Sequence, residues 1–171
     1  MKERFDVLVR PVLGDLYRFA LRLAKDPVRA EDLLQASLVK GLGRLKDLRD
    51  DRAYKAWQSR ILYTTWLDAK AKRKEEPMIP ERVEAQGARG PGPEGRLMGQ
   101  QLGDAIARAL DRLPEGQRDA VWLVDGQGHS FAETAEILGI APGTAASRVA
   151  RARRALREWL APVALDQGVL R

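Results

Sequence analysis

The stretch that decides the fold is residues 130–157, which read SFAETAEILGIAPGTAASRVARARRALR. Its first part predicts a short helix over residues 131–138, ended by Gly139 because glycine readily adopts the left-handed conformation that follows helix C-termini. The apolar positions of this helix are Phe131, Ala135 and Leu138. A second helix is expected to open after residues 141–143, Ala-Pro-Gly. Two helices joined by such a turn form a helix-turn-helix motif, whose second helix enters the major groove of DNA.

The second helix of this motif is predicted to be apolar on one side and basic on the other. The apolar stripe consists of Ala145, Val149, Ala152, Leu156 and Leu160. Pointing away from it are Thr144, Ser147, Arg151 and Arg154, with Arg148 on the shoulder. A solvated surface is the alternative interpretation, but solvated faces usually mix charges, whereas residues 144–157 hold five arginines and no acid. Arginine can pair with guanine, and Ser or Thr with base edges or phosphates, so the pattern favours DNA binding.

Charge is distributed unevenly along the chain. The 171 residues carry a net charge of +6, and 44% of them are hydrophobic. Residues 1–75 have 18 basic and 11 acidic side chains, whereas residues 98–171 have 9 of each. Within the latter segment, seven acids lie between residues 104 and 136, and the arginine cluster follows Thr144. Segregation of this kind makes one face attractive to phosphate.

Several classes of site are not expected. The chain has no cysteine, which excludes disulfides and thiolate metal sites, and a lone His129 cannot build a zinc site and is interpreted as a loop residue. No cofactor or metal is therefore predicted. No apolar run approaches the roughly 20 residues of a membrane span, and the N-terminus lacks the apolar segment of a signal peptide. These features predict a cytoplasmic protein that is not inserted in a membrane.

Two helices are predicted in the first 45 residues. Apolar residues at helical spacing cover residues 4–24, with Pro11 a kink or an early break. Asp26 followed by Pro27 is a typical helix start, and the second helix is expected to run to about Leu45. Its apolar residues are Leu33, Leu34, Leu38, Val39, Leu42 and Leu45. This sector is wider than one core face needs, so the helix either lies centrally in a bundle or keeps part of its surface for a partner.

A third helix is predicted over residues 52–75, capped by Asp50-Asp51. One face carries Trp57, Ile61, Thr64 and Asp68, interleaved with Arg60, Tyr63 and Trp66. The helix ends in the basic tail Lys70, Lys72, Arg73 and Lys74. Aromatic residues beside cations are typical of single-stranded DNA binding, where bases stack on the rings. Tryptophans on a helix also commonly lie in the core, and both interpretations stay open for Trp57 and Trp66.

The chain is predicted to be all-α, with two small helical domains joined by a flexible linker. Four Pro and four Gly residues occur between Pro77 and Arg96 without periodicity, which predicts a linker over residues 76–97. The first domain is then residues 1–75, a three- or four-helix bundle, and the helix-turn-helix domain is residues 98–162. Residues 163–171 are predicted to be a frayed tail. The core of the second domain is expected to contain Leu110, Leu113, Val121, Leu123, Val124, Leu138 and Leu156.

At this point nearly the whole chain resembles bacterial RNA polymerase sigma factors of the extracytoplasmic-function (ECF) group. One set of motifs is similar to the domain called region two: Leu16-Tyr17, residues 30–35 (AEDLLQ), Trp57, Arg60-Ile61, Leu67-Asp68 and Lys72-Arg73. A second set is similar to region four: Leu113-Pro114, Gln117-Arg118, Glu133, Ala135, residues 137–140 (ILGI), Gly143-Thr144, Ser147-Arg148 and residues 151–153 (RAR). Each motif alone is weak, but both sets in this order and spacing are highly specific.

The resemblance implies a transcription initiation factor rather than an enzyme. Its partners would be core RNA polymerase, through the β′ clamp coiled coil and the β flap, promoter DNA and an anti-sigma factor. The surface implied for the coiled coil is Asp32, Leu33, Gln35 and Leu38. The residues implied for recognising and melting the minus-ten element are Trp57, Arg60, Thr64, Asp68, Lys72 and Arg73. For the minus-thirty-five element they are Thr144, Ser147, Arg148 and Arg151, with Arg118 and Arg154 on phosphates.

Two other classes of function remain as alternatives. A helix-turn-helix regulator that works without polymerase, such as a dimeric repressor, would explain residues 98–160 but not the first 75. A nuclease would need acids that converge on a metal, and Asp26, Glu31, Asp32 and Asp68 lack a recognisable ligand spacing.

Overall fold

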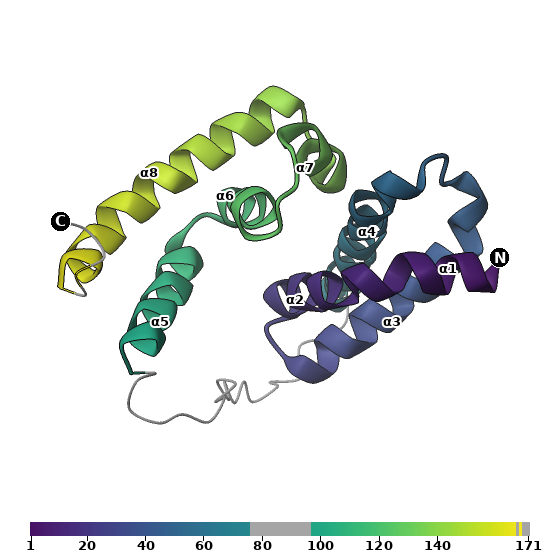
Figure 1. Cartoon of the computed structure of the whole chain (residues 1–171), viewed down its shortest axis with the longest axis horizontal. Coiled ribbons are helices and arrows are strands. Elements are labelled where there is room, and N and C mark those ends of the chain that lie inside the picture. The colour runs from purple at the N-terminus through teal and green to yellow at the C-terminus, as the bar shows by residue number, and fades with distance from the viewer. Residues whose placement is uncertain (76–96, 167, 169–171) are drawn as a thin grey trace. The chain divides into compact units, whose positions relative to one another are not determined.

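The structure, a computed structural model, describes residues 1–75, 97–166 and 168 (Figure 1). Over these ranges the regular secondary structure is helical and no strand is present, which confirms the predicted all-α class. The chain forms two compact units, one N-terminal and one C-terminal, and each is described by itself.

The first unit contains α1 (Lys2–Val9), α2 (Leu13–Ala24), α3 (Pro27–Arg44) and α4 (Tyr54–Glu75). Pro11 breaks the first predicted helix, because residues 10–12 form a 3₁₀ turn between α1 and α2. The Asp26 carboxylate accepts a hydrogen bond from the backbone N–H of Arg29 at 2.8 Å, and Pro27 occupies the first position of α3. Helices α2, α3 and α4 pack against one another and bury Leu16, Phe19 and Leu62 completely.

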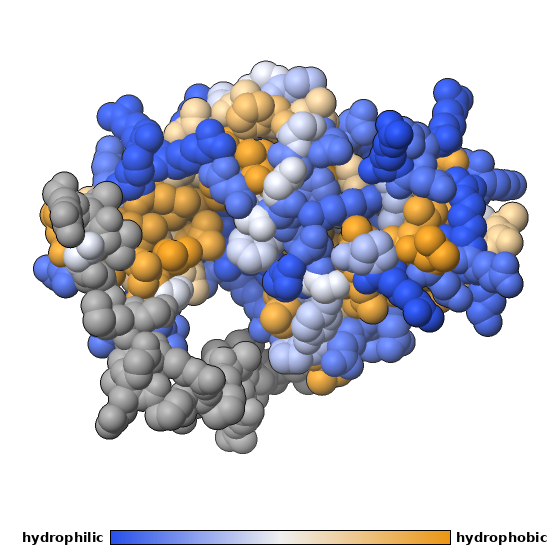
Figure 2. Space-filling view, in the orientation of Figure 1, coloured by the Kyte–Doolittle hydropathy of each residue, from blue (hydrophilic) through white to orange (hydrophobic). Residues whose placement is uncertain are grey.

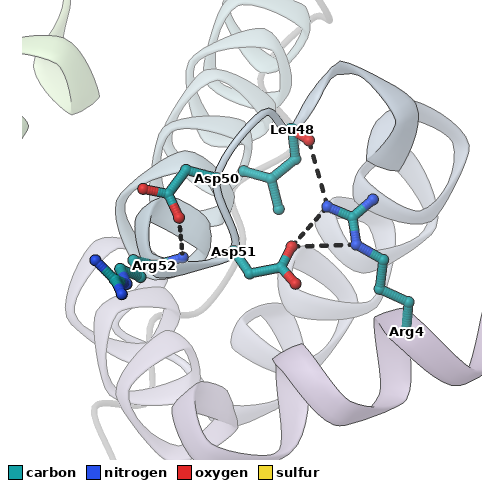
Figure 3. Close-up of polar contacts among 5 residues, drawn as sticks. All are labelled: Arg4, Leu48, Asp50, Asp51 and Arg52. Atoms are coloured by element: carbon teal, nitrogen blue, oxygen red, sulfur yellow. Dashed lines mark hydrogen bonds and ion pairs between the residues drawn. The ribbon is translucent and has the colours of Figure 1, made fainter.

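Helix α1 is fastened to the segment that joins α3 and α4. The Phe5 ring meets Tyr54 edge-on, with the ring centroids 6.1 Å apart. The Arg4 guanidinium donates to Asp51 at 2.6 and 3.1 Å and to the Leu48 carbonyl oxygen at 3.3 Å (Figure 3). The apolar contact and the ion pair together hold the N-terminus of the chain against this connection.

Helix α4 is capped where the sequence predicted, but it begins slightly later than predicted. Asp50 accepts a hydrogen bond from the backbone N–H of Arg52 at 2.9 Å, as drawn in Figure 3. Residues Asp51–Ala53 form a 3₁₀ turn, so the α-helix proper begins at Tyr54, two residues after the predicted start. A second 3₁₀ turn, Leu45–Asp47, follows α3.

Helices α3 and α4 are in close contact at a glycine. The Gln58 side chain of α4 is completely buried, and its Nε2 donates to the Ser37 carbonyl oxygen at 2.9 Å. A Cβ atom placed on Gly41 would lie 2.1 Å from Gln58 Oε1. Only a residue without a side chain fits at Gly41 while Gln58 keeps this position.

The second unit contains α5 (Leu97–Arg112), α6 (Glu115–Val121), a π-helical turn (Trp122–Gly126), most of α7 (Phe131–Leu138) and α8 (Pro142–Asp166). Pro114 separates α5 from α6. Helices α5 and α6 both pack on α8 around Leu110, Leu113, Val121 and Ala152. Hydrophobic side chains gather between α5 and α8 in Figure 2.

The predicted core of this unit is correct in part. Leu110, Leu113, Val121 and Leu123 are buried. Val124, Leu138 and Leu156 are only half-buried, and Phe131 is 41% exposed. Leu156 packs at the edge of the core cluster formed by Leu110, Leu113, Val121 and Ala152, so part of its apolar surface stays accessible.

Helix α8 is longer than predicted at both ends. It begins at Pro142, where the fixed φ of proline suits the first helical position, rather than after Gly143. The predicted tail of residues 163–171 is wrong as far as Asp166, because the helix continues through Pro162. Leu160 and Val163, on either side of this proline, are half-buried, although a proline inside a helix removes one backbone hydrogen bond. The linker predicted over residues 76–97 lies outside the described residues, except for Leu97, which opens α5.

Candidate nucleic-acid interface

Helices α7 and α8 form the predicted helix-turn-helix, and both ends of α7 are capped. Ser130 Oγ accepts from the Glu133 N–H at 3.0 Å, and the Glu133 carboxylate accepts from the Ser130 N–H at 2.9 Å. At the other end, Gly139 has φ +66°, and the Ile140 N–H donates to the Ala135 carbonyl oxygen at 3.0 Å. The Ser-x-x-Glu spacing is a readable capping-box signal that the sequence analysis missed.

Helix α8 has the predicted apolar and polar faces. Ala145, Val149 and Ala152 are completely buried, and Leu156 and Leu160 are half-buried. On the opposite side, Ser147, Arg151 and Arg154 are exposed, and Thr144 and Arg148 are half-buried. The buried stripe fixes the rotation of α8, so the residues predicted for the minus-thirty-five element share one accessible surface.

Ion pairs distinguish the arginines of this surface from one another. Arg153 makes two hydrogen bonds to Asp125, at 2.8 and 2.6 Å, and this carboxylate raises the pKa of Arg153. Arg154 Nε lies 3.4 Å from Glu158 Oε1, and both side chains are largely exposed. Within the described part of the chain, Arg151 forms no ion pair or hydrogen bond through its side chain. The same holds for Arg148, so Arg148 and Arg151 are the predicted DNA-binding arginines of α8 whose charges have no acidic partner among the described residues.

Arg118 has a structural contact that the sequence did not indicate. The residue is half-buried on α6, and its Nη2 donates to the Leu113 carbonyl oxygen at 3.0 Å. A cation suits this place, because carbonyl groups at the end of α5 concentrate negative charge there. Arg118 thus ties α6 to α5.

Four of the six residues predicted for the minus-ten element converge in the first unit. Trp57, Arg60, Thr64 and Asp68 line one pocket of about 810 Å³ on α4. The remaining lining residues are Lys40, Gly43, Arg44, Asp47 and Ile61. The sequence analysis missed Lys40, Arg44 and Asp47, although their spacing of four and three residues places them on one helical face. The pocket is therefore formed by the end of α3 and the middle of α4.

The pocket is lined by an aromatic ring, a hydroxyl group and side chains of both positive and negative charge. Trp57 is half-buried and packs on the core cluster beside Tyr54, with the ring centroids 5.9 Å apart, so it is both a core residue and a pocket wall. Thr64 Oγ1 lies 3.0 Å from the carbonyl oxygens of Arg60 and Ile61. Its hydroxyl hydrogen is thereby used within α4, and its oxygen can still accept a hydrogen bond.

Asp68, Lys72 and Arg73 differ in their surroundings. Asp68 lies 3.5 Å from Lys40 Nζ, so its carboxylate has a cation beside it at the pocket edge. Lys72 and Arg73 do not line the pocket and are exposed. The Arg73 guanidinium lies 5.9 Å from the Trp66 ring centroid, which is a cation–π contact.

The surface predicted for the polymerase coiled coil lies on α3. Asp32 and Gln35 are exposed, and Leu38 is half-buried. Leu33 is only 7% exposed, so its side chain belongs mainly to the core and leaves little surface for a partner. The exposed apolar residues of α3 are instead Val28 at 67% and Val39 at 73%, at helical spacing with Asp32 and Gln35.

The remaining candidates add no chemistry to these surfaces. His129 is buried in the loop before α7, and its backbone N–H donates to the Leu123 carbonyl oxygen at 3.0 Å. Within the described ranges, no three metal-ligating side chains (His, Cys, Asp or Glu) are placed to hold a metal ion. None of the described helices combines the length and apolar content needed to cross a bilayer.

Comparison with known proteins gives concordant matches to both units. The family described as sigma-70 region 2 matches residues 8–76, and sigma-70, region 4 matches residues 103–156. The ECF RNA polymerase sigma factor SigM of Mycobacterium tuberculosis is 37% identical over 91% of this chain and 76% of its own length. The ECF RNA polymerase sigma factor SigE of Mycolicibacterium smegmatis is 34% identical over 92% of this chain, which spans 62% of that relative.

A solved structure is also similar. The sigma factor RpoE of Bartonella quintana, in complex with the anti-sigma factor NepR, matches with a TM-score of 0.71 at 30% identity. The match covers 94% of this chain and 98% of that one.

Proposed function

Because the chain belongs to the ECF group of sigma-70 RNA polymerase sigma factors, we propose that its two units bind promoter DNA at two separate elements while core polymerase holds them. The protein is then a transcription initiation factor that directs core polymerase to specific promoters. Such a factor works in the cytoplasm, where polymerase and DNA are.

The second unit binds the minus-thirty-five element in this proposal. The observation that carries it is the surface of α8, where Ser147 and Arg151 are exposed, with α8 following a helix, α7, that is capped at both ends. Thr144, Ser147, Arg148 and Arg151 face the major groove, and Arg154 faces a phosphate. Arg118 contributes mainly through its hydrogen bond to the Leu113 carbonyl oxygen, which holds α6 on α5. Any contact of Arg118 with a phosphate is made by the part of the guanidinium that faces away from Leu113.

The first unit binds and helps to open the minus-ten element. Moving a base out of the duplex costs a few kcal/mol of free energy, and stacking and polar contacts in a pocket can offset this cost. The pocket on α4 offers the Trp57 ring for stacking and the Thr64 oxygen as an acceptor, with Arg60 and Lys40 at its edge. Lys72 and Arg73, farther along α4, contact the backbone of the separated strand.

The exposed part of α3 docks on core polymerase. This face combines two exposed apolar side chains, Val28 and Val39, with the polar residues Asp32 and Gln35 between them. Protein–protein interfaces commonly combine apolar and polar surface in this way. We assign this face to the β′ clamp coiled coil, and the second unit to the β flap. An anti-sigma factor is a further proposed partner, supported by the Bartonella quintana relative that was solved with one.

The mechanism predicts weak promoter binding by the chain alone and much tighter binding by the holoenzyme. Each unit binds weakly, and polymerase raises the effective concentration of the second unit once the first has bound. Run-off transcription with purified core polymerase on a promoter library, with and without the chain, tests the function directly. Equal dissociation constants for the chain alone and the holoenzyme on the selected promoter would contradict the proposal. A palindromic footprint by the chain alone would favour a dimeric regulator.

A further inference from the structure

Arg148 packs against the first turn of α6. Helices α6 and α8 are in close contact, and Val121 of α6 is buried in one cluster with Ala152 of α8. Gly116 is the second residue of α6. A Cβ atom built on it would lie 3.0 Å from both Cζ and Nη1 of Arg148 and 3.3 Å from its Nε. The guanidinium therefore occupies the space that a side chain at Gly116 would need.

These three distances also show which part of the guanidinium faces α6. If this Cβ atom lay in the plane of the guanidinium, beside the edge between Nε and Nη1, then Cζ would be the most distant of the three atoms. Cζ is instead as near as Nη1 and nearer than Nε, so the planar face of the group lies over Gly116. Stacking through the face leaves the N–H groups at the rim available as donors.

The backbone does not require glycine at this position. Among the described glycines, positive φ values occur only at Gly128, Gly139 and Gly168. Alanine would favour helix formation at Gly116, since glycine is a poor residue inside a helix. What glycine supplies here is the space for Arg148.

We infer that Gly116 is a positioning residue for promoter recognition. Its missing side chain lets Arg148 stack on α6 in the orientation that reads one base pair of the minus-thirty-five element. This inference rests on the proposed function, in which Arg148 faces the major groove. An arginine already held against α6 loses less rotamer freedom on binding than one that extends into solvent, which favours the specific contact.

The test uses the holoenzyme and a library of promoter duplexes randomised in the minus-thirty-five element, with the bound fraction sequenced. Arg148→Ala identifies the base pair that Arg148 reads, because preference at that position alone falls, by roughly tenfold. Gly116→Ala, which displaces the guanidinium by a small distance, is expected to lower the same preference in part. Gly116→Leu fills the site and is expected to lower it as far as Arg148→Ala does.

Gly103 provides the matched control. It is exposed on α5, and no atom lies within 4 Å of a Cβ built there. Gly103→Ala and Gly103→Leu change helix propensity in the same way and are expected to leave every base preference unchanged. Gly116→Ala also keeps the test interpretable where the larger leucine disturbs folding.

The combination of Gly116→Leu with Arg148→Ala decides whether the glycine acts through the arginine. The double variant is expected to bind the library as Arg148→Ala does. A further loss in the double variant, or an unchanged preference in Gly116→Leu, would overturn the inference. So would an Arg148→Ala variant that alters no position. If the wild-type holoenzyme enriches no sequence, the proposed function itself fails, and the inference fails with it.

Discussion

The contact between α3 and α4 makes two neighbouring glycines respond in opposite ways to the same substitution. A Cβ atom at Gly41 would lie 2.1 Å from Oε1 and 2.9 Å from Cδ of Gln58. A Cβ atom at Gly43, two residues along α3, would have nothing within 4 Å. We therefore predict that Gly41→Ala destabilises the first unit, whereas Gly43→Ala stabilises it.

The magnitudes follow from the surroundings of the two glycines. Replacing glycine by alanine inside a helix stabilises it by about 0.5–1 kcal/mol, which is the whole effect expected at Gly43. At Gly41, the buried Gln58 side chain must move, and overpacking of this kind costs about 1–3 kcal/mol. The movement also breaks the 2.9 Å hydrogen bond to the Ser37 carbonyl oxygen, which adds about 1–3 kcal/mol. The expected net loss for Gly41→Ala is about 1–5 kcal/mol.

Hydrogen exchange measured by mass spectrometry on the full chain reads the two units separately. Amides in α3 and α4 should exchange faster in Gly41→Ala and more slowly in Gly43→Ala, with α5 and α8 unchanged in both variants. Equal protection of α3 in the two variants would refute the reasoning, since it would mean that Gln58 withdraws from Gly41 at no cost.

Three further predictions concern buried and charged side chains. Tyr54 is 2% exposed, its hydroxyl has no hydrogen-bond partner among the described residues, and burial raises its pKa, so Tyr54→Phe should leave stability in urea unchanged or raise it by up to about 1 kcal/mol. The Lys55 ammonium, 2.7 Å away, holds the pKa of Asp15 below its usual 3.8, so Asp15→Asn should cost about 0.2–1 kcal/mol at pH 7. That cost should begin to fall once the pH drops below 3.8, where the unfolded chain takes up the proton, and should be lost below the lowered pKa of folded Asp15, so urea titrations should show a smaller cost at pH 3 than at pH 7. Arg151→Ala should weaken holoenzyme binding to promoter DNA by about 1–3 kcal/mol, and Arg153→Ala by less, in salt-dependent affinity measurements.

The helices could be predicted where local chemistry decides them. Asp26-Pro27, Pro11 and Gly139 each act within one turn of the chain, and the structure has a boundary at each of them. The end of α8 could not be predicted in this way, because whether a helix continues past a proline, as α8 does at Pro162, depends on the packing around it. That packing involves Leu160 and Val163, and a local pattern does not reveal how far they are buried.

The candidate sites were predicted less completely than the helices. Periodicity placed Trp57, Thr64 and Asp68 on one helical face together with Ile61, and the resemblance added Arg60; all five line the pocket. The other side of the pocket comes from the end of α3, and its position depends on how closely α3 and α4 pack. Likewise, burial of Leu33 depends on which side of a wide apolar sector meets the bundle. Contacts between helices settled these points, and the sequence pattern carries little information about them.

The pairing of arginines on α8 supports the proposal that tight promoter binding requires polymerase. A basic run attracts DNA in proportion to the phosphates that it can neutralise. Arg153 already shares its charge with Asp125 in two short hydrogen bonds, and Arg154 has Glu158 beside it. Breaking either pair to reach a phosphate exchanges one ionic contact for another, so the net gain is smaller than the count of arginines suggests. Under the proposed function, the second unit is thus suited to weak, selective contact through Arg148 and Arg151, and tight binding is expected to come from holding both units on one promoter at once.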